Sequence, residues 1–300
     1  MADESSLPLA PGLYLVATPI GNLQDITLRA LDVLTRADLI ACEDTRQTQK
    51  LLNHFGVTTR TESLHEHNEH ERSARIVEEL RSGKRIAVVS DAGMPGISDP
   101  GSILAQAAIA AGIAVIPIPG ANAALSALVA SGLPTSEFRF IGFLPEKAGQ
   151  RRTRIEELAE TATTPASTWM FYEAPHRILE TLADFEAVFG PDLQVVVARE
   201  LTKIHEEFLR GPVADVRKEM ETRDRVRGEI TLLVKAEPRV AAESGAQGHQ
   251  TIAERVAQLC AQPDVDEKEA LKQLAREMGR SKSELYRELQ RERAARRTRP

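Results

Sequence analysis

The sequence predicts an α/β protein with two α/β domains and a small helical domain at the C-terminal end. Short apolar runs alternate with helical patterns over residues 1–120, and again in a more mixed order over residues 121–236. Such alternation is typical of sheets covered by helices, with mainly parallel strands in the first domain. Residues 237–249 contain proline, serine and glycine without a clear period and predict a linker, and residues 250–300 predict a basic helical domain.

In the first domain, continuous apolar runs that end at glycine, proline or polar residues predict buried strands. These runs cover residues 13–18, 38–42, 86–90 and 114–118. Helical spacing of apolar residues between them predicts helices near residues 28–34, 45–54, 76–80 and 103–111.

The second domain and the tail follow the same reasoning. Strands are expected at residues 138–143, 168–172, 195–198 and 230–234, and helices at 151–160, 176–188 and 213–221. The mixed order indicates some antiparallel pairs. The tail predicts helices at 251–260, 267–278 and 283–295, and its residues 271–285 fit a helix-turn-helix as well as an ordinary helical hairpin.

The charge of the chain is distributed unevenly. Its 300 residues carry a formal net charge of −6, which by itself argues against a nucleic-acid partner because phosphates are bound by lysine and arginine. Residues 278–300 contain eight basic and three acidic side chains, so this stretch carries +5 and the rest of the chain −11. The basic tail keeps a nucleic-acid partner open, with a solvated helical face as the alternative.

Composition excludes several classes of protein. No apolar run approaches eighteen residues, which predicts no membrane span, and the polar, acidic residues 1–6 do not resemble a signal peptide. Two cysteines, Cys42 and Cys260, are too few for a zinc cluster or a disulfide framework. The sequence therefore predicts a cytoplasmic protein without a metal site.

The densest group of special residues is the segment 90–101, which follows a predicted strand and precedes a predicted helix. Three glycines and two prolines there predict a rigid loop with exposed backbone groups, at the sheet edge where α/β proteins bind ligands. The alternative is an ordinary strand-to-helix turn with Asp99 as the N-cap. The loop matches neither the Walker nor the dinucleotide-binding glycine pattern.

Similar loops follow other predicted strands and would place polar groups from two domains around one cleft. They cover residues 18–23, 119–123, 172–177, 199–203 and 227–229. Each has a structural alternative, such as Pro175 as a first-turn proline or Glu200 and Lys203 as a surface pair.

These motifs resemble the ribosomal RNA small subunit methyltransferase I family of the tetrapyrrole-methylase superfamily. The resemblance covers about residues 12–234, and the basic tail is consistent with the small C-terminal domain of that family. It rests on the segments 17–23 (ATPIGNL), 43–46 (EDTR), 90–93 (SDAG), 97–101 (ISDPG), 142–145 (GFLP), 172–173 (YE), 175–177 (PHR) and 198–203 (ARELTK).

The resemblance implies two α/β domains of tetrapyrrole-methylase type with S-adenosylmethionine in the cleft between them. It also implies a homodimer that methylates the ribose 2′-oxygen of a cytidine in the decoding region of 16S rRNA, as naked rRNA or in the 30S subunit. The implied donor-binding residues are Pro19, Asp91, Ala92, Gly93, Ile97, Ser98, Asn122, Ala123, Tyr172, Leu201 and Ile230. The implied RNA-binding residues are Arg46, Arg177, Arg280, Lys282 and Arg287.

The sequence does not single out a catalytic base. A ribose hydroxyl is a poor nucleophile until it loses its proton, and the candidate catalytic residues are Glu173, Lys203 and Arg199, with His176, Glu43 and Asp44 as further possible bases. Lys203 would serve as a base if its pKa were lowered. Arg177 and Arg199 would hold phosphates, position acidic side chains or form a structural ion-pair network.

The chain departs from the family pattern at a few positions. Met94, the pair Ala121 and Asn122, and Cys42 replace residues usual in the family, and all are expected at or near the donor pocket.

Two other functions remain open from the sequence. One is a methylase acting on a tetrapyrrole or another small molecule, which leaves the basic tail unexplained. The other is a non-catalytic RNA-binding protein of ribosome assembly.

Overall fold

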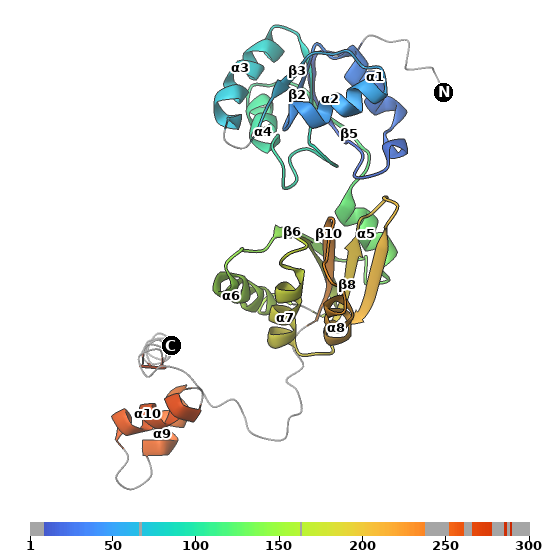
Figure 1. Cartoon of the computed structure of the whole chain (residues 1–300). Coiled ribbons are helices and arrows are strands. Elements are labelled where there is room, and N and C mark those ends of the chain that lie inside the picture. Colours follow the sequence, from blue (N-terminus) through green and yellow to red (C-terminus); the bar gives the residue numbers. More distant parts are fainter. Residues whose placement is uncertain are drawn as a thin grey trace. The chain divides into compact units, whose positions relative to one another are not determined.

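The computed structural model describes residues 9–65, 68–162, 164–237, 252–260, 266–277, 285–286 and 289 (Figure 1). The chain divides into two compact units, Met1–Arg239 and Val240–Pro300. The larger unit contains two five-stranded sheets. Among the described helices, none is long and apolar enough to cross a membrane.

The first sheet is parallel in all its described pairings and has the strand order β3-β2-β4-β1-β5. Its strands are β1 (Gly12–Val16), β2 (Leu39–Cys42), β3 (Thr61–Ser63), β4 (Arg85–Val89) and β5 (Val115–Ile118). One face packs on α1 (Leu28–Arg36) and α2 (Thr45–His54), and the other on α3 (Glu69–Arg81) and α4 (Ser102–Ala110). Burial on both faces explains why these strands are continuously apolar.

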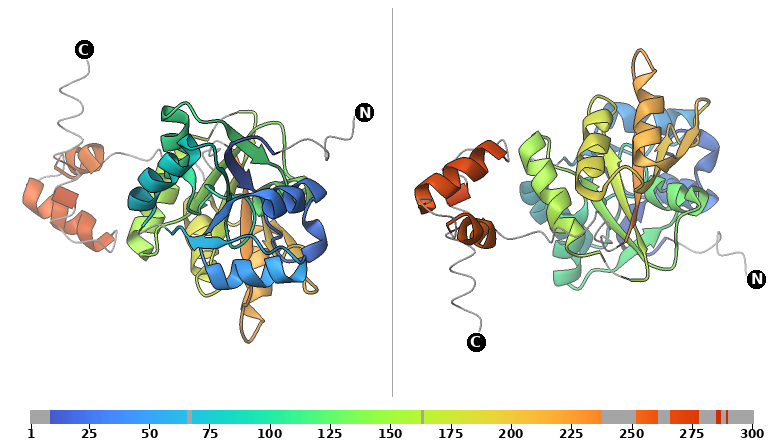
Figure 2. Two further views of the ribbon diagram at one scale, coloured as in Figure 1. Left: turned by 90° about the horizontal axis from the view of Figure 1, so that it is seen from above. Right: turned by 90° about the horizontal axis from the view of Figure 1, so that it is seen from below.

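The second sheet is mixed and has the order β6-β7-β10-β8-β9, in which only β6 and β7 are parallel among the described pairs. Its strands are β6 (Phe138–Phe143), β7 (Ser167–Glu173), β8 (Gln194–Arg199), β9 (Glu207–Pro212) and β10 (Ile230–Ala236). Helices α6 (Ala148–Ala159), α7 (Ile178–Phe189) and α8 (Val213–Glu221) cover one face, and α5 (Ala123–Ser131) covers the other. Figure 2 shows these helices outside the strands.

The structure confirms the predicted strands and helices of this unit, with ends shifted by a few residues, and the antiparallel pairs. Sequence reasoning missed β3, β9, α5 and the short 3₁₀-helix η2 (Leu23–Asp25). Strand β3 reads Thr-Glu-Ser and has no apolar residue, while α5 is apolar on most sides and shows little helical contrast. Both elements are defined by their neighbours rather than by their own pattern.

The smaller unit contains α9 (Ile252–Cys260) and α10 (Glu267–Glu277), which confirms the first two predicted tail helices. Its apolar core combines Ile252 and Val256 with Leu271 and Leu274, and it includes Leu285 and Leu289. The turn of the predicted helix-turn-helix and most of its third helix lie outside the described residues.

The N-terminus of α4 is capped by a side chain from another helix. Its N-cap residue is Gly101, with φ of 122°, so the alternative in which Asp99 is the N-cap is wrong. Instead, Glu69 Oε1 accepts hydrogen bonds from the backbone N–H groups of Gly101 (2.8 Å), Ile103 (3.0 Å) and Leu104 (3.2 Å). Glu69 is only 3% exposed, and its carboxylate lies where a helix carries partial positive charge.

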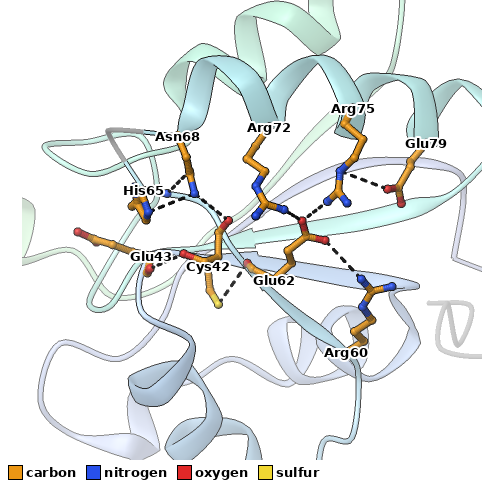
Figure 3. A network of polar contacts seen from close by, with 10 residues as sticks. Cys42, Glu43, Arg60, Glu62, His65, Asn68, Arg72, Arg75 and Glu79 are labelled. Atoms are coloured by element: carbon orange, nitrogen blue, oxygen red, sulfur yellow. Dashed lines mark hydrogen bonds and ion pairs between the residues drawn. The ribbon is translucent and has the colours of Figure 1, made fainter.

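Edge strand β3 is fastened to α3 by a cluster of charges around Glu62 (Figure 3). Glu62 forms ion pairs with Arg72 and Arg75 of α3, and Arg60 approaches its other oxygen at 3.6 Å. The hydrogen bond from Arg75 holds the pKa of Glu62 below its usual value, although partial burial opposes this effect. Charged side chains along an edge strand also discourage pairing with another chain.

We expect Glu69→Ala to lower the free energy of unfolding by about 2 kcal/mol, because three backbone donors at the start of α4 lose a charged acceptor. Glu69→Gln keeps an acceptor oxygen and is expected to lose about half as much. Urea unfolding would measure both changes. Glu71→Ala, at an exposed position of α3, the helix that carries Glu69, is the matched control. An equal loss of unfolding free energy in that variant would contradict the capping role.

Candidate functional site

A pocket of about 350 Å³ lies where loops of the first sheet meet the second sheet. The loop after β4 contributes one side, and the ends of β6, β7, β8 and the start of β10 contribute the other. Its lining comprises Ile20, Ala92, Gly93, Met94, Ile97, Ser98, Asp99, Asn122, Ala123, Phe143, Tyr172, Glu173, Ala174, Pro175, Ala198, Leu201, Gly228, Glu229, Ile230 and Thr231. This lining confirms that the predicted loops form one cleft.

The loop after β4 is held in shape by backbone bonds. Thr18 and Gly93 exchange two N–H···O=C bonds of 2.9 and 3.0 Å, which join this loop to the end of β1. Farther along, the N–H of Gly96 donates to the carbonyl of Pro100 at 3.0 Å. Ser98 has a φ of 60°, a conformation that costs a non-glycine residue energy and that often occurs at functional sites.

A second strained loop follows β8 and meets the loop after β1. Glu200 and Thr202 both have positive φ, of 52° and 65°. The hydroxyl of Thr202 accepts a hydrogen bond from the N–H of Asn22 at 3.0 Å. A Cβ at Gly21 would lie 2.5 Å from the Lys203 side chain, so only glycine permits this approach.

Aromatic rings form part of the pocket wall. Tyr172 packs edge-on against Phe140, with ring centroids 5.0 Å apart, and against Phe143, at 5.8 Å. Burial raises the pKa of Tyr172, so its phenol stays neutral at neutral pH. Phe143 lines the pocket and is still 56% exposed, which leaves an aromatic surface open to a ligand.

Glu173 is a pocket residue whose carboxylate is fully occupied. It is 3% exposed and accepts from the N–H of Ala174 (2.8 Å), the hydroxyl of Thr181 (2.7 Å) and two nitrogens of Arg177 (2.6 and 2.9 Å). This arrangement fixes the end of β7 to the start of α7. The geometry favours a positioning role for Glu173, and its predicted catalytic role stays a prediction.

Lys203 does not have the lowered pKa that a lysine base needs. Partial burial opposes its charged form, but hydrogen bonds to Glu200 (2.7 Å) and Glu229 (2.9 Å) outweigh burial and raise the pKa above its usual value. The suggested pairing of Glu200 with Lys203 is confirmed. Lys203 itself is not among the residues that line the pocket.

Arg199 belongs to a separate ion-pair cluster. Its Nε donates to Glu207 at 2.9 Å, and Arg223 donates to the same carboxylate at 2.6 and 2.7 Å. The hydrogen bonds from Arg223, with that from Arg199, lower the pKa of Glu207 to about 2 against the opposing effect of partial burial. Arg199 therefore joins β8 to β9 in the structure, and it does not line the pocket.

The pocket is acidic. Among its described lining residues, Asp99, Glu173 and Glu229 are carboxylic acids and none is lysine, arginine or histidine. Burial, with the nearby charges of Glu43 and Asp91, raises the pKa of Asp99 to about 7. Carboxyl groups beside apolar and aromatic surface, with no basic side chain in the described lining, fit an organic cation better than an anion.

Most predicted donor-binding residues line this pocket, and their role stays a prediction. Pro19 and Asp91 do not line it. Pro19 is buried beside the Thr18–Gly93 bridge, while the exposed Asp91 accepts a hydrogen bond from the N–H of Asp44 at 3.2 Å. The residues that do line it are Ala92, Gly93, Ile97, Ser98, Asn122, Ala123, Tyr172, Leu201 and Ile230.

The predicted RNA-binding residues have different surroundings. Arg46 projects from the start of α2 with its side chain 87% exposed and paired to Asp44 at 2.8 Å. Arg177 is 11% exposed and held by Glu173. Arg280, Lys282 and Arg287 lie outside the described residues.

Two further details of the sequence analysis are wrong. Cys42 is not at the donor pocket: it is fully buried in the core of the first sheet, where burial raises the pKa of its thiol. Pro175 is not in a first helical turn, because α7 begins at Ile178. Of the other departures from the family pattern, Met94 and Asn122 line the pocket, and Ala121 does not.

The pocket residues that sequence reasoning did not predict as site residues include Asp99, Phe143, Glu229 and Thr231. All four lie in or beside loops that the sequence had marked. A rule that takes every residue at the end of a predicted strand as a site candidate includes these residues, because the loops at strand ends meet at one edge of the sheet.

We expect Gly228→Ala to destabilise the larger unit, because a Cβ there would lie 2.4 Å from the Glu200 carboxyl group and displace it from Lys203. Gly83→Ala is the matched control, since its φ of 90° equals the 91° of Gly228 and nothing lies within 4 Å of its added Cβ. The control is expected to lose about 1 kcal/mol from backbone strain alone. Thermal unfolding measures both variants. Equal losses of stability in Gly228→Ala and Gly83→Ala would contradict the predicted clash with Glu200.

Known proteins resemble this chain over most of its length. The family model of Tetrapyrrole (Corrin/Porphyrin) Methylases matches residues 12–217. A ribosomal RNA small subunit methyltransferase I of Halalkalibacterium halodurans is 48% identical over 279 residues, which cover 91% of this chain and 93% of that protein. A Vibrio cholerae protein of the same name is 49% identical over 78% of this chain and 81% of its own.

Solved structures share the fold at low identity. A diphthine synthase has a TM-score of 0.58 and 17% identity, with 75% of this chain and 89% of that chain covered. A Thermus thermophilus uroporphyrin-III-C-methyltransferase has a TM-score of 0.51 and 20% identity, with 75% and 94% covered. The chain therefore belongs to the tetrapyrrole methylases, within the family of ribosomal RNA small subunit methyltransferase I.

Proposed function

We propose that the protein transfers a methyl group from S-adenosylmethionine to the ribose 2′-oxygen of a cytidine in the decoding region of 16S rRNA. It acts in the cytoplasm as a homodimer, on rRNA or the 30S subunit. The observation that carries the rRNA substrate is 48% identity, over 91% of the chain, to a relative named for that activity. The cytidine and its 2′-oxygen rest on the motif resemblance.

The chemistry of the pocket supports a sulfonium donor. When bound, S-adenosylmethionine supplies a methyl group on a positively charged sulfur, which is a good leaving group. The acidic lining and the absence of lysine, arginine and histidine among its described residues favour such a cation. Tyr172 and Phe143 offer rings for a heteroaromatic base.

In this reaction the protein mainly orients the methyl donor and the acceptor oxygen relative to each other. The loop after β4 is bonded to Thr18 at the end of β1, and Asn22 in the loop after β1 donates to Thr202 in the loop after β8, so the two sides of the pocket are joined. Placing an acceptor oxygen in line with the carbon–sulfur bond can supply several kcal/mol, because a collision becomes an intramolecular event. The strained φ values of Ser98, Glu200 and Thr202 are consistent with loops that are preorganised for this purpose.

A direct test maps 2′-O-methyl groups on 16S rRNA from cells with and without the gene. We expect one cytidine mark in the decoding region to disappear without the gene and to return when purified protein and S-adenosylmethionine are added to the unmodified 30S subunits. An unchanged set of marks would overturn the rRNA substrate. A lost mark on the base rather than the ribose would overturn the 2′-oxygen.

Arg46 is proposed to contact an RNA phosphate, because its guanidinium is exposed on the helix that follows β2, and the preceding Asp44 hydrogen-bonds Asp91 at the edge of the pocket loop. We expect Arg46→Ala to weaken RNA binding and to reduce the slope of log affinity against log salt by about one. Filter binding across a salt series measures this. Arg152→Ala, an exposed arginine of α6, is the control, and equal slopes in the two variants would contradict the contact.

A further inference from the structure

The three carboxyl groups of the pocket differ in what they contact. Glu173 accepts from Ala174, Thr181 and Arg177, and Glu229 pairs with Lys203. Asp99, by contrast, has neither a hydrogen bond nor an ion pair with any residue in the described part of the chain. It is thus the pocket carboxylate whose oxygens are open to a ligand.

The backbone holds Asp99 in place, although its side chain has no partner among the residues that the structure describes. Pro100, the next residue, accepts the N–H of Gly96, and Glu69 binds the N–H of Gly101. On the other side, the constrained Ser98 lies against Gly142 of β6, where a Cβ would be 3.3 Å from its hydroxyl. The backbone that carries Asp99 is therefore anchored on both sides at the edge of the pocket.

In the described part of the chain, the charges that act on Asp99 come from Glu43 and Asp91, and both are negative. Burial contributes most to the raised pKa of about 7, and the charges of Glu43 and Asp91 add to it. Across the pocket, Tyr172 is neutral, and its pKa in turn is raised slightly by Asp99. A carboxyl group with a pKa near neutrality is a much stronger base than an ordinary aspartate and is still partly ionised at pH 7.

We propose that Asp99 is the proton acceptor of the methyl transfer, an assignment that rests on the proposed function. The substrate oxygen forms its bond to the methyl carbon while the carbon–sulfur bond breaks and leaves its electron pair on sulfur. The hydroxyl proton passes to the Asp99 carboxylate, which then releases it to solvent. Atoms and charge balance without a metal or a further reactant.

The proposal has a consequence that does not depend on turnover. A cationic donor near Asp99 stabilises the ionised carboxylate, so donor binding releases a proton wherever Asp99 is protonated in the free protein. Affinity for S-adenosylmethionine therefore falls as the pH drops through about 7. S-adenosylhomocysteine, whose sulfur is neutral, should show a weaker dependence.

The test compares wild type with Asp99→Asn and Asp99→Glu. On unmodified 30S subunits, we expect Asp99→Asn to lower kcat at least 100-fold and to remove the acidic limb of its pH profile, and Asp99→Glu to recover part of the rate. Calorimetry should show wild-type affinity for S-adenosylmethionine rising several-fold from pH 6 to pH 8, and a flat profile for Asp99→Asn. Asp215→Asn, at an exposed position on α8, is the control and should match wild type.

Contrary results separate the two proposals. A kcat of Asp99→Asn within threefold of wild type would overturn the role of Asp99 and leave the proposed function intact. If wild type methylates neither unmodified 30S subunits nor free 16S rRNA, the proposed function fails. In that case the calorimetric measurement tests the role of Asp99 by itself. A wild-type affinity for S-adenosylmethionine that does not change with pH would overturn the assignment.

Discussion

The hydrogen bonds to the Glu69 carboxylate hold the loop after β4, through which the first sheet contributes to the pocket. This carboxylate supplies the acceptor that the first turn of α4 lacks, because Gly101 has no side chain to cap the helix. The same three bonds fix the end of the loop after β4, and the Thr18–Gly93 bridge fixes its beginning. Ser98 and Asp99 lie between these two anchors, so a buried carboxylate outside the pocket helps to hold the backbone that carries two pocket residues.

Charge is distributed in the molecule according to what each part contacts. The described lining of the pocket holds carboxyl groups without basic residues, which agrees with a cationic methyl donor. Arginines are instead engaged in structural pairs, as with Arg177 on Glu173 and Arg199 on Glu207. In the proposed function, an RNA substrate is attracted by exposed arginines such as Arg46 and by the basic tail, which carries +5 against −11 for the rest.

Sequence patterns predicted the elements that have a pattern of their own. The apolar runs of β1, β2 and β4 are buried on both faces, and α7 and α8 carry an apolar stripe. The edge strand β3 could not be recognised, since its backbone pairs with β2 but its side chains have no apolar period. The loops of the site were recognisable from glycine and proline, whereas the roles of Lys203 and Arg199 were not. The pKa of Lys203 and the contacts of both side chains depend on residues outside their own loop.

By itself, the sequence determined the α/β class, the two-sheet body, the basic tail and the family, because these follow from local periodicity, composition and ordered motifs. Only the tertiary structure decided which residues of those motifs face the pocket. Asp91 and Asp99 belong to one loop and have the same chemistry. The first is exposed and bonded to Asp44, whereas the second lines the pocket without a partner in the described part of the chain. That difference arises from backbone conformations and long-range hydrogen bonds, and neither is encoded in residue type alone.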